Sequence, residues 1–450
     1  MTKQPLMSSQ DTAQFIPPDD RPTLITRVRV IDPSAQIDTY HDVLVSPEGI
    51  EFDPLDVPDP IVRIDGDGLW AVPGLIDLQV HFRQPGFEHK ETLESGSRAA
   101  LAGGVTTCVV MPNTKPALDT PEAVRFQHEE SQRVHGVRIL VAAAATRGLA
   151  GEELTDYGAL HAAGAPAITD DGFPVLDDAL MERSLELCAE HDLLFMQHAE
   201  DTKMTGHRPM TEGPTSQALN IEGQPADAEG VMVERDIALT EKLGARYHVL
   251  HCSTARSLRA VRSAKARGAK VSCEASPHHL LLTDEACAGG DTNFKMNPPL
   301  RSEADRQALV EALMDGTVNA VATDHAPHAS AEKAQSFADA PFGVIGLETA
   351  FAALLSFFHE RKIDSRAAVA LMTAGPAGVL QREGELGTMV GERAPRDLCL
   401  VDPMMKWMVD ETTLFGQAKN SPFLGRTFRG RVVATFVDGR LRYALTNPQG

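Results

Sequence analysis

The feature that most constrains the fold is a regular alternation of two kinds of segment between residues 71 and 379. Short apolar runs rich in β-branched residues alternate with longer amphipathic stretches, the pattern of repeated β-α units on a parallel sheet. Eight strands are predicted, at residues 71–78, 104–111, 137–143, 167–169, 193–196, 247–250, 270–274 and 319–323. Helices are predicted at residues 91–102, 121–134, 177–191, 226–243, 254–267 and 303–314. The simplest closure of this α/β pattern is a (β/α)8 TIM barrel.

The segments on either side of the predicted barrel have a different pattern. Residues 23–70 and 380–446 contain short alternating runs separated by turn residues, which predict strands. Asp438-Gly439, between two alternating apolar runs, is the clearest hairpin signal. We therefore expect a small β-sandwich domain formed by both chain ends. Residues 1–22 are polar and contain prolines, and we expect a flexible N-terminal tail there.

Composition argues against several classes of function. The formal net charge of −21 disfavours nucleic acid and anionic membranes as partners, because both repel an acidic protein. We find neither an apolar run of the roughly 20 residues that a membrane helix needs nor an apolar signal segment, so we expect a cytoplasmic protein. The six cysteines lie mostly in apolar runs, which is typical of buried thiols.

Five side chains that can bind metal ions lie at or just after the ends of predicted strands. They are His81, Asp171, His198, His251 and Asp324. In a barrel the carboxyl ends of the strands meet at one mouth, where barrel enzymes build their active sites. Three imidazoles and two carboxylates suit Zn²⁺ or a similar divalent cation. A single histidine after a strand is more often structural, but five such residues at five strand ends favour a metal site.

The same residues predict metal-assisted hydrolysis. A carboxylate can bridge two metal ions, and water bound between them becomes a nucleophile near neutral pH. Asp324 is the expected catalytic residue, because it is placed to take a proton from that water and return it to a leaving nitrogen. His279 and His325 are interpreted as residues that orient the site through hydrogen bonds.

Short motifs accompany these residues along the chain. Three of them are His81-Phe82-Arg83-Gln84-Pro85-Gly86, Thr169-Asp170-Asp171-Gly172 and Thr323-Asp324-His325-Ala326-Pro327-His328. Others lie at residues 73–77, 103–107, 111–114, 277–280, 295–301 and 420–423. Together these strings resemble those of the bacterial class I dihydroorotases of the amidohydrolase superfamily, over the whole barrel and into both flanks. Hydantoinases and allantoinases share the barrel but usually hold their metals with a carboxylated lysine, where this chain has Asp171 as the expected bridging carboxylate.

The resemblance implies reversible, metal-dependent hydrolysis of dihydroorotate to N-carbamoyl-L-aspartate in pyrimidine (UMP) biosynthesis. Residues 329–341 look like a loop that closes over the substrate. The implied substrate-binding residues are Arg83, Asn113, Asn297, His328, Phe342 and Gly343. Arg83 suits a carboxylate because its planar guanidinium can bind both oxygens. The structural alternatives are a surface salt bridge for Arg83 and turn capping for Asn113 and Asn297.

Gln79 departs from the family pattern. It stands where the resemblance implies the first metal-ligand histidine. The neutral amide oxygen of glutamine is a poorer zinc donor than an imidazole, so we expect one or two Zn²⁺ per chain, with the second site weakened. The implied ligand set is His81, Asp171, His198, His251 and Asp324, with Gln79 as an uncertain sixth member.

Three functions are weighed for such a chain. We favour an active dihydroorotase that acts on a small anionic substrate. The first alternative is a non-catalytic dihydroorotase-like subunit that scaffolds aspartate transcarbamoylase, but such proteins usually lose several ligands and this chain loses one. The second is a cyclic amidohydrolase for hydantoin or allantoin, whose neutral ring would give Arg83 and Asn113 nothing to bind. We expect a homodimer, with aspartate transcarbamoylase as a further candidate partner.

Overall fold

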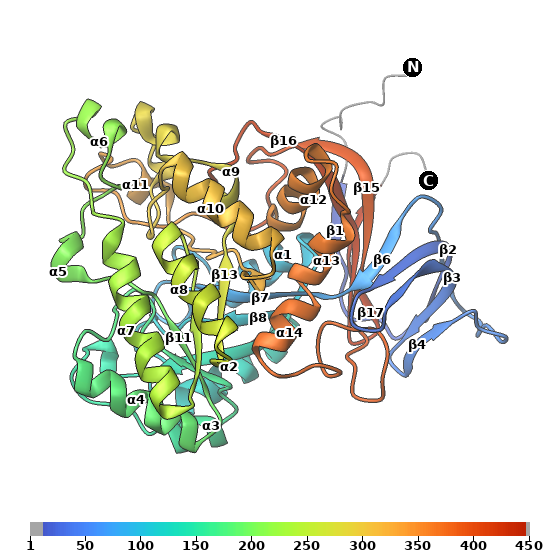
Figure 1. Ribbon diagram of the computed structural model, residues 1–450. Helices are drawn as coiled ribbons and strands as arrows, with labels where there is room; N and C mark the ends of the chain where they lie inside the picture. Colours follow the sequence, from blue (N-terminus) through green and yellow to red (C-terminus); the bar gives the residue numbers. More distant parts are fainter. Residues whose placement is uncertain (1–11, 447–450) are drawn as a thin grey trace.

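The computed structural model describes residues 12–446 of the 450-residue chain. Its larger part is a parallel barrel surrounded by helices (Figure 1). Eight barrel strands lie side by side in chain order among the described residues, which confirms the predicted fold class. They are β7 (Leu75–Val80), β8 (Val105–Val110), β9 (Arg138–Ala144), β10 (Ala167–Thr169), β11 (Leu194–Gln197), β12 (Arg246–Val249), β13 (Val271–Ala275) and β14 (Ala320–Val321).

The barrel closes where the first strand meets the segment that follows the last one. Val80 forms a parallel bridge with His325, and the backbone N–H of His81 donates to the carbonyl oxygen of His325 over 2.8 Å. This closure lies at the carboxyl end of the barrel, beside the residues predicted to bind metal. The position of those residues is therefore fixed by backbone hydrogen bonds.

At least one helix follows each barrel strand, and eight helices, one after each strand, cover the outer side of the barrel (Figure 1). These helices are α1 (Leu93–Ala102), α2 (Pro121–Arg133), α3 (Tyr157–Ala162), α4 (Asp178–Glu190), α7 (Asp227–Leu243), α8 (Ala255–Ala266), α10 (Glu303–Met314) and α12 (Ala350–Glu360). Local sequence explains several of their starts. Before α2, for example, the Thr120 hydroxyl accepts the N–H of Ala123, and Pro121 occupies the first turn, where its missing N–H costs nothing.

Two apolar layers hold the barrel together. Ile76 and Leu78 belong to an inner cluster with residues of the other strands, whereas Val80 packs in the outer cluster with helix residues. The inner cluster also contains Ala377 of α14 (Ala374–Val379), a helix that contacts β7 and β14. The interior is thus a packed core, as expected for a barrel of this size.

The predicted strand at residues 71–78 is two strands in the structure. β6 (Trp70–Pro73) joins the small sheet, and β7 opens the barrel. Gly74 separates them, and a Cβ atom at this position would lie 2.2 Å from Oγ1 of Thr106. Only glycine fits such a close approach, so the chain changes sheets here.

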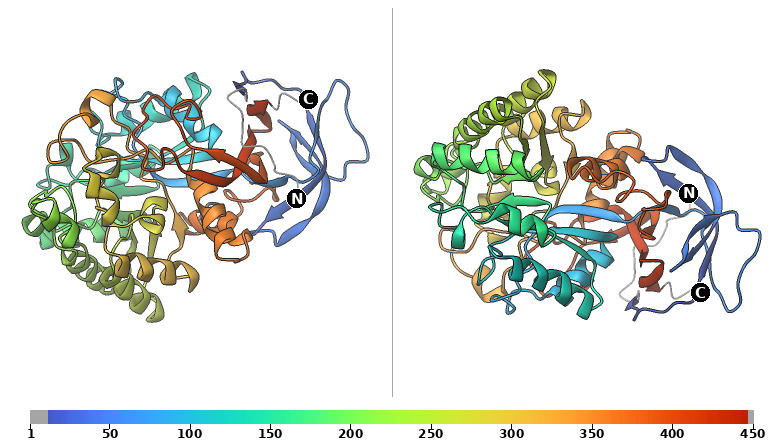
Figure 2. Two further views of the ribbon diagram at one scale, coloured as in Figure 1. Left: turned by 90° about the horizontal axis from the view of Figure 1, so that it is seen from above. Right: turned by 90° about the horizontal axis from the view of Figure 1, so that it is seen from below.

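Both chain ends form the second sheet, which belongs to the smaller part of the molecule and lies at one end of it in all three views (Figures 1 and 2). Within the described residues its order is β1-β17-β16-β15-β6-β2-β3-β4, with β5 beside β2. Val43 of β3 and Phe436 of β16 share one apolar core, which makes the two halves a small sandwich. The strands are β1 (Thr12–Phe15), β2 (Thr23–Asp32), β3 (Ile37–Ser46), β4 (Gly49–Phe52), β5 (Val62–Asp65), β15 (Leu398–Met408), β16 (Thr427–Val437) and β17 (Arg440–Thr446).

Two details of the chain ends bear on the predictions. Asp438 and Gly439 both have positive φ, 49° and 77°, as the tight turn of the predicted β16-β17 hairpin requires. Part of the predicted tail at residues 1–22 is a strand, because β1 pairs with β17 in antiparallel register. Phe15 of β1 packs on Phe415 and Tyr443, and this apolar contact holds the segment. Residues 1–11 lie outside the described part of the chain.

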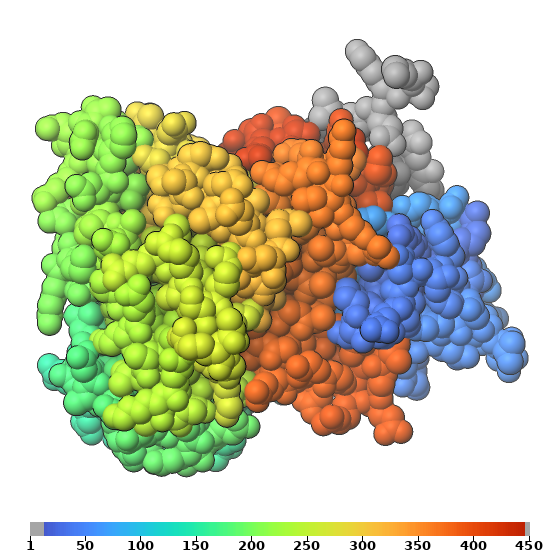
Figure 3. Space-filling model, in the orientation of Figure 1, coloured from blue at the N-terminus to red at the C-terminus, as the bar shows by residue number. Residues whose placement is uncertain are grey.

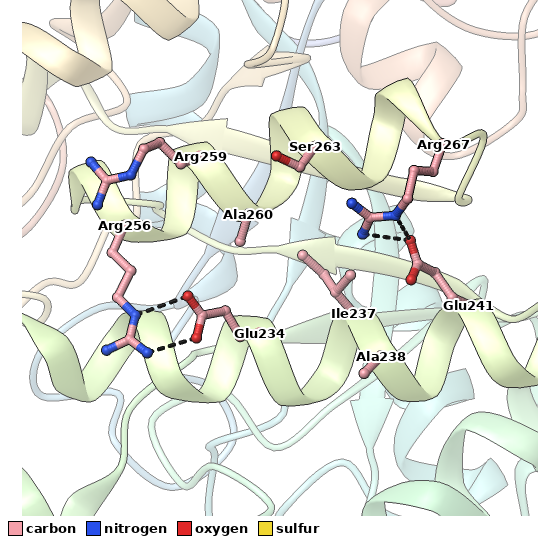
Figure 4. Close-up of a pocket in the computed structure, with 9 residues that line it drawn as sticks. All are labelled: Glu234, Ile237, Ala238, Glu241, Arg256, Arg259, Ala260, Ser263 and Arg267. Carbon is pink, nitrogen blue, oxygen red and sulfur yellow. Dashed lines mark hydrogen bonds and ion pairs between the residues drawn. The ribbon is translucent and has the colours of Figure 1, made fainter.

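Helices form the outer surface of the barrel, where the space-filling view shows α7 and α8 side by side (Figure 3). A groove of about 420 Å³ runs between these two helices. Ion pairs between Arg256 and Glu234 and between Arg267 and Glu241 join its two rims (Figure 4). Within residues 12–446, no helix combines the length and apolarity needed to span a membrane.

Candidate metal centre and substrate site

The five predicted metal ligands come from five strand ends and meet at one mouth of the barrel. His198 follows β11 directly, and Asp171 and His251 lie two residues beyond β10 and β12. His81 follows β7, and Asp324 lies three residues beyond β14. All five side chains are buried. The strand-end argument from the sequence therefore predicted residues that lie together in space.

An irregular pairing register in β7 sets the direction in which the side chains of Gln79 and His81 point. The pairing of β7 with β8 is irregular between Asp77 and Val80. Before this irregularity the even-numbered residues face the inner core, and after it Val80 faces the outer layer. Such bulges often re-aim side chains next to active sites. Here the irregularity lets Gln79 and His81 face the mouth of the barrel.

Asp171, His198 and His251 form the tightest group of candidate ligands. Their ligand atoms all lie within 4.8 Å of one another. Nδ1 of His198 is 2.9 Å from Nε2 of His251 and 3.6 Å from Oδ1 of Asp171. The other nitrogen of His198 faces Oε2 of Glu200 at 3.1 Å, as the outer nitrogen of a metal-bound histidine usually faces a carboxylate.

His81, Asp171 and Asp324 form a second group beside the first. Nε2 of His81 lies 3.0 Å from Oδ1 of Asp324 and 3.2 Å from Oδ2 of Asp171. Its Nδ1 lies 2.9 Å from Oδ1 of Asn113, which can only accept a hydrogen bond. The Nδ1 proton is therefore donated to Asn113, and Nε2 faces two carboxylate oxygens. A second ring proton, or a cation in its place, satisfies that arrangement.

Gln79 lies within the second group and is fully buried. Its Nε2 donates to Oδ1 of Asp171 over 3.1 Å. Its Oε1 is buried and has no hydrogen-bond partner among the described residues. Buried amide oxygens almost always have a partner, so this atom is free to accept a donor or a cation.

The electrostatics of the first group also favour a cation. Burial alone would raise the pKa of Asp171, but hydrogen bonds from His198 and His251 and the charge of His81 hold it well below its usual value. Burial alone would lower the pKa of His198, but hydrogen bonds to Asp171 and Glu200 raise it to about 10. The group retains positive charge on His198 while its carboxylate stays ionised, and a divalent cation can take the place of that proton.

Two further contacts support the backbone of the site. Asp77 is buried and accepts the N–H groups of Gln79 and Thr323, and burial raises its pKa to about 7. Nδ1 of His325 accepts the N–H of Gly346, so its Nε2–H donates to Glu91 over 2.8 Å. His325 thus joins the loop after β7 to the segment after β14, and its orienting role stays a prediction. His279 lies apart from this network, with Nε2 2.9 Å from the carbonyl oxygen of Pro298.

The predicted substrate-binding residues surround the metal groups. Arg83 is no surface salt bridge: its Nε donates to the carbonyl oxygen of Pro327, beside Asp324. Asn297 donates to Oε2 of Glu200 over 2.7 Å. Nε2 of His328 lies 2.7 Å from the carbonyl oxygen of Phe342. Gly343 has φ of 131°, and a Cβ there would lie 2.8 Å from that of Ala326, so glycine is required.

Three charged residues of this region were not predicted. Glu200 lies two residues after His198, and in an extended chain residues two apart point to the same side. This spacing could have predicted that Glu200 lies beside His198. Lys90 and Glu91 lie in the loop after β7, and Lys90 contacts both His328 and Glu332. Nothing in the local sequence pattern distinguishes these two from solvated loop residues.

Comparison with known proteins identifies the family. The dihydroorotase of Solibacter usitatus is 43% identical over 94% of this chain and 98% of its own length. The dihydroorotase of Syntrophobacter fumaroxidans is 42% identical over 94% and 97%. The chain belongs to the dihydroorotase family. A family model described as dihydro-orotase-like also matches residues 68–257.

Solved structures of cyclic amide hydrolases share the fold. The L-hydantoinase (dihydropyrimidinase) from Arthrobacter aurescens superposes with a TM-score of 0.81 at 24% identity, over 93% of this chain and 95% of that one. A D-hydantoinase (dihydropyrimidinase) from a Thermus species gives 0.79 at 23%, over 93% and 94%. At 23–24% sequence identity these structures show only that the fold is shared. The family assignment rests on the 42–43% identity to dihydroorotases.

Proposed function

We propose that this chain catalyses the reversible hydrolysis of dihydroorotate to N-carbamoyl-L-aspartate, a step of pyrimidine biosynthesis. The observation that carries the proposal is that half-buried Arg83 and Asn113 lie next to the ligand group of His81, Asp171 and Asp324. A cation and an amide beside a hydrolytic centre suit a ring that carries a carboxylate. The identity to dihydroorotases over 94% of the chain supports the same reaction.

We propose Zn²⁺ as the metal, with one or two ions per chain. Asp171, His198 and His251 would hold the first ion, and His81, Asp171 and Asp324 would hold a second with help from the free Oε1 of Gln79. When bound, such an ion supplies Lewis acidity and lowers the pKa of water. The first site has its full set of donors, so we expect it to bind more tightly than the second.

Asp324 is the proposed proton carrier. The reaction breaks the bond between the ring nitrogen and its neighbouring carbonyl carbon; water supplies the hydroxyl group for carbon and the proton for nitrogen. A buried carboxylate beside the attacked carbon can accept the proton and then deliver it to nitrogen. The φ of Asp324, 49°, is uncommon for a residue with a side chain, and such backbone strain is concentrated at functional sites.

The substrate carboxylate is proposed to bind Arg83 and Asn113. Partial burial of Arg83 strengthens its interaction with an anion, because fewer water molecules screen the charges. Asn297 is proposed to contact the ring amide, and the backbone of Phe342 and Gly343 to line the opposite side. These assignments account for specificity toward an anionic ring over a neutral one.

The deciding experiment measures turnover and metal content together. Purified protein reconstituted with Zn²⁺ should hydrolyse dihydroorotate and form it again from N-carbamoyl-L-aspartate. Hydantoin and allantoin should be turned over about 100-fold less efficiently, because they leave Arg83 without a partner. Equal efficiency toward a neutral ring would contradict the proposed substrate.

A second candidate function follows from Gln79, since loss of a ligand is expected in a non-catalytic subunit that scaffolds aspartate transcarbamoylase. Metal-loaded protein without turnover, combined with turnover in Gln79→His, would favour this alternative. The homodimer, an association with aspartate transcarbamoylase and the cytoplasmic location all stay predictions, which size-exclusion chromatography and co-purification can test.

A further inference from the structure

Lys90 connects two loops at the mouth of the barrel. It lies in the loop between β7 and α1, and its side chain is 15% exposed. Its Nζ is 3.2 Å from Nδ1 of His328 and 3.1 Å from Oε1 of Glu332. His328 belongs to the loop after β14, and Glu332 belongs to α11 (Ser330–Lys333). One ammonium group thus bridges the first and last loops of the barrel.

The hydrogen bonds of His328 fix its proton. Nε2 lies 2.7 Å from the carbonyl oxygen of Phe342, which can only accept, so Nε2 carries the hydrogen. Nδ1 then offers a lone pair, and the Lys90 ammonium donates to it. Both ring nitrogens are therefore engaged, and the imidazole is neutral in this arrangement. The chain of contacts runs from Lys90 through His328 to the backbone of Phe342.

The charges around His328 come from several elements. Arg83 after β7, Lys90 before α1 and Lys333 of α11 are positive, and Glu332 of α11 is the facing carboxylate. Oε2 of Glu332 lies 3.6 Å from Nδ1 of His328. Lys90 pairs with Glu332 and so offsets the carboxylate that would otherwise attract a second proton to the ring.

We propose that Lys90 is a positioning residue of the substrate site, which holds His328 neutral and oriented so that His328 fixes Phe342 against the bound ring. The role deepens the proposed function and rests on it for its kinetic effect. The acidic character of the substrate makes the arrangement useful, because Lys90 and Arg83 both place positive charge near His328. No other described residue contacts both His328 and Glu332 with an ammonium group.

The test compares Lys90→Met with the parent enzyme. Lys90→Met should raise KM for dihydroorotate roughly tenfold, the size expected for losing one charge-assisted hydrogen bond, and should change kcat much less. Lys90→Arg should restore most of the parent KM, because a guanidinium can still donate to both partners. Lys242→Met is the matched control, since Lys242 pairs with Glu182 on the outer helices; its KM should equal the parent value. A parent-like KM in Lys90→Met would overturn the proposal.

A second measurement, the pKa of His328, does not depend on catalytic activity. The pKa of His328 can be followed by NMR of ¹⁵N-labelled histidine, with His328→Asn to identify its signals. In Lys90→Met the unpaired Glu332 becomes the nearest charge to Nδ1, so the pKa of His328 should rise by about one unit or more. The double variant Lys90→Met, Glu332→Gln should reverse that rise. If the parent shows no turnover, the proposed function fails, but this measurement still decides the role of Lys90. An unchanged pKa of His328 in Lys90→Met would refute that role.

Discussion

Nε2 of Gln79 lies 3.1 Å from Oδ1 of Asp171, the carboxylate shared by both candidate metal groups. The amide hydrogen bond takes one lone pair of that carboxylate, and the amide oxygen is left buried without a partner among the described residues. Gln79 therefore supplies a donor to the shared ligand and an acceptor to the second metal group. A histidine at this position would supply only a ring nitrogen.

Gln79→His should strengthen the second metal group. The imidazole is a better zinc donor than an amide oxygen and removes the hydrogen bond that competes for Asp171. We expect metal content after dialysis to rise from about one ion per chain toward two, as determined by elemental analysis. Two tightly held ions in the parent protein would contradict this prediction. Gln217→His, on the exposed side of α6 (Pro214–Ala218), is the control.

Glu200→Gln should weaken metal binding by about 10- to 100-fold. The Glu200 carboxylate faces Nε2 of His198 at 3.1 Å and raises the basicity of the opposite nitrogen, whereas an amide does so less. Competition with a chromophoric chelator measures the change in affinity. Glu212→Gln, at an exposed position of the same loop region, should leave affinity unaltered. Equal affinity in both variants would exclude this role of Glu200.

The sequence predicted the parts of the fold that depend on local patterns. Each of the eight predicted strand ranges overlaps a barrel strand, and the Asp438-Gly439 hairpin forms as predicted, because buried strands leave short apolar, β-branched runs in the sequence. The break at Gly74 was missed, because it depends on the distant Thr106. The pairing of β1 with β17 was missed for the same reason, as it joins residues more than 400 positions apart.

The candidate site was predictable to a similar degree. Strand ends converge in any barrel, so His81 and Asp324 could be placed together from their positions alone. The free Oε1 of Gln79 and the contact of Lys90 with His328 depend on side-chain rotamers and on loops of irregular conformation. Such details follow from tertiary packing, which the sequence pattern does not encode locally.

Binding of the first metal ion, to Asp171, His198 and His251, should release about one proton near pH 7.5. The pKa of His198 is raised to about 10, so at pH 7.5 its metal-free ring is protonated on both nitrogens. The metal ion must displace one of these protons to bind. Apparent affinity should therefore rise with pH between about 6 and 9, by up to tenfold per unit. Calorimetry in two buffers with different ionisation enthalpies counts the protons. Binding without proton release would show that His198 is already neutral.

Asp324→Asn should lower kcat by about 10²- to 10⁴-fold, the usual contribution of a general base, because an amide cannot take up a proton. Asparagine is the right replacement, since it tolerates the positive φ of 49° at this position better than alanine does. The group of Asp171, His198 and His251 does not depend on Asp324, so one ion should remain bound. Asp56→Asn, at an exposed position between β4 and β5 and far from the barrel mouth in sequence, serves as the control for kcat. If Asp324→Asn retained its metal and its parental kcat, the proton would have to be carried by another group.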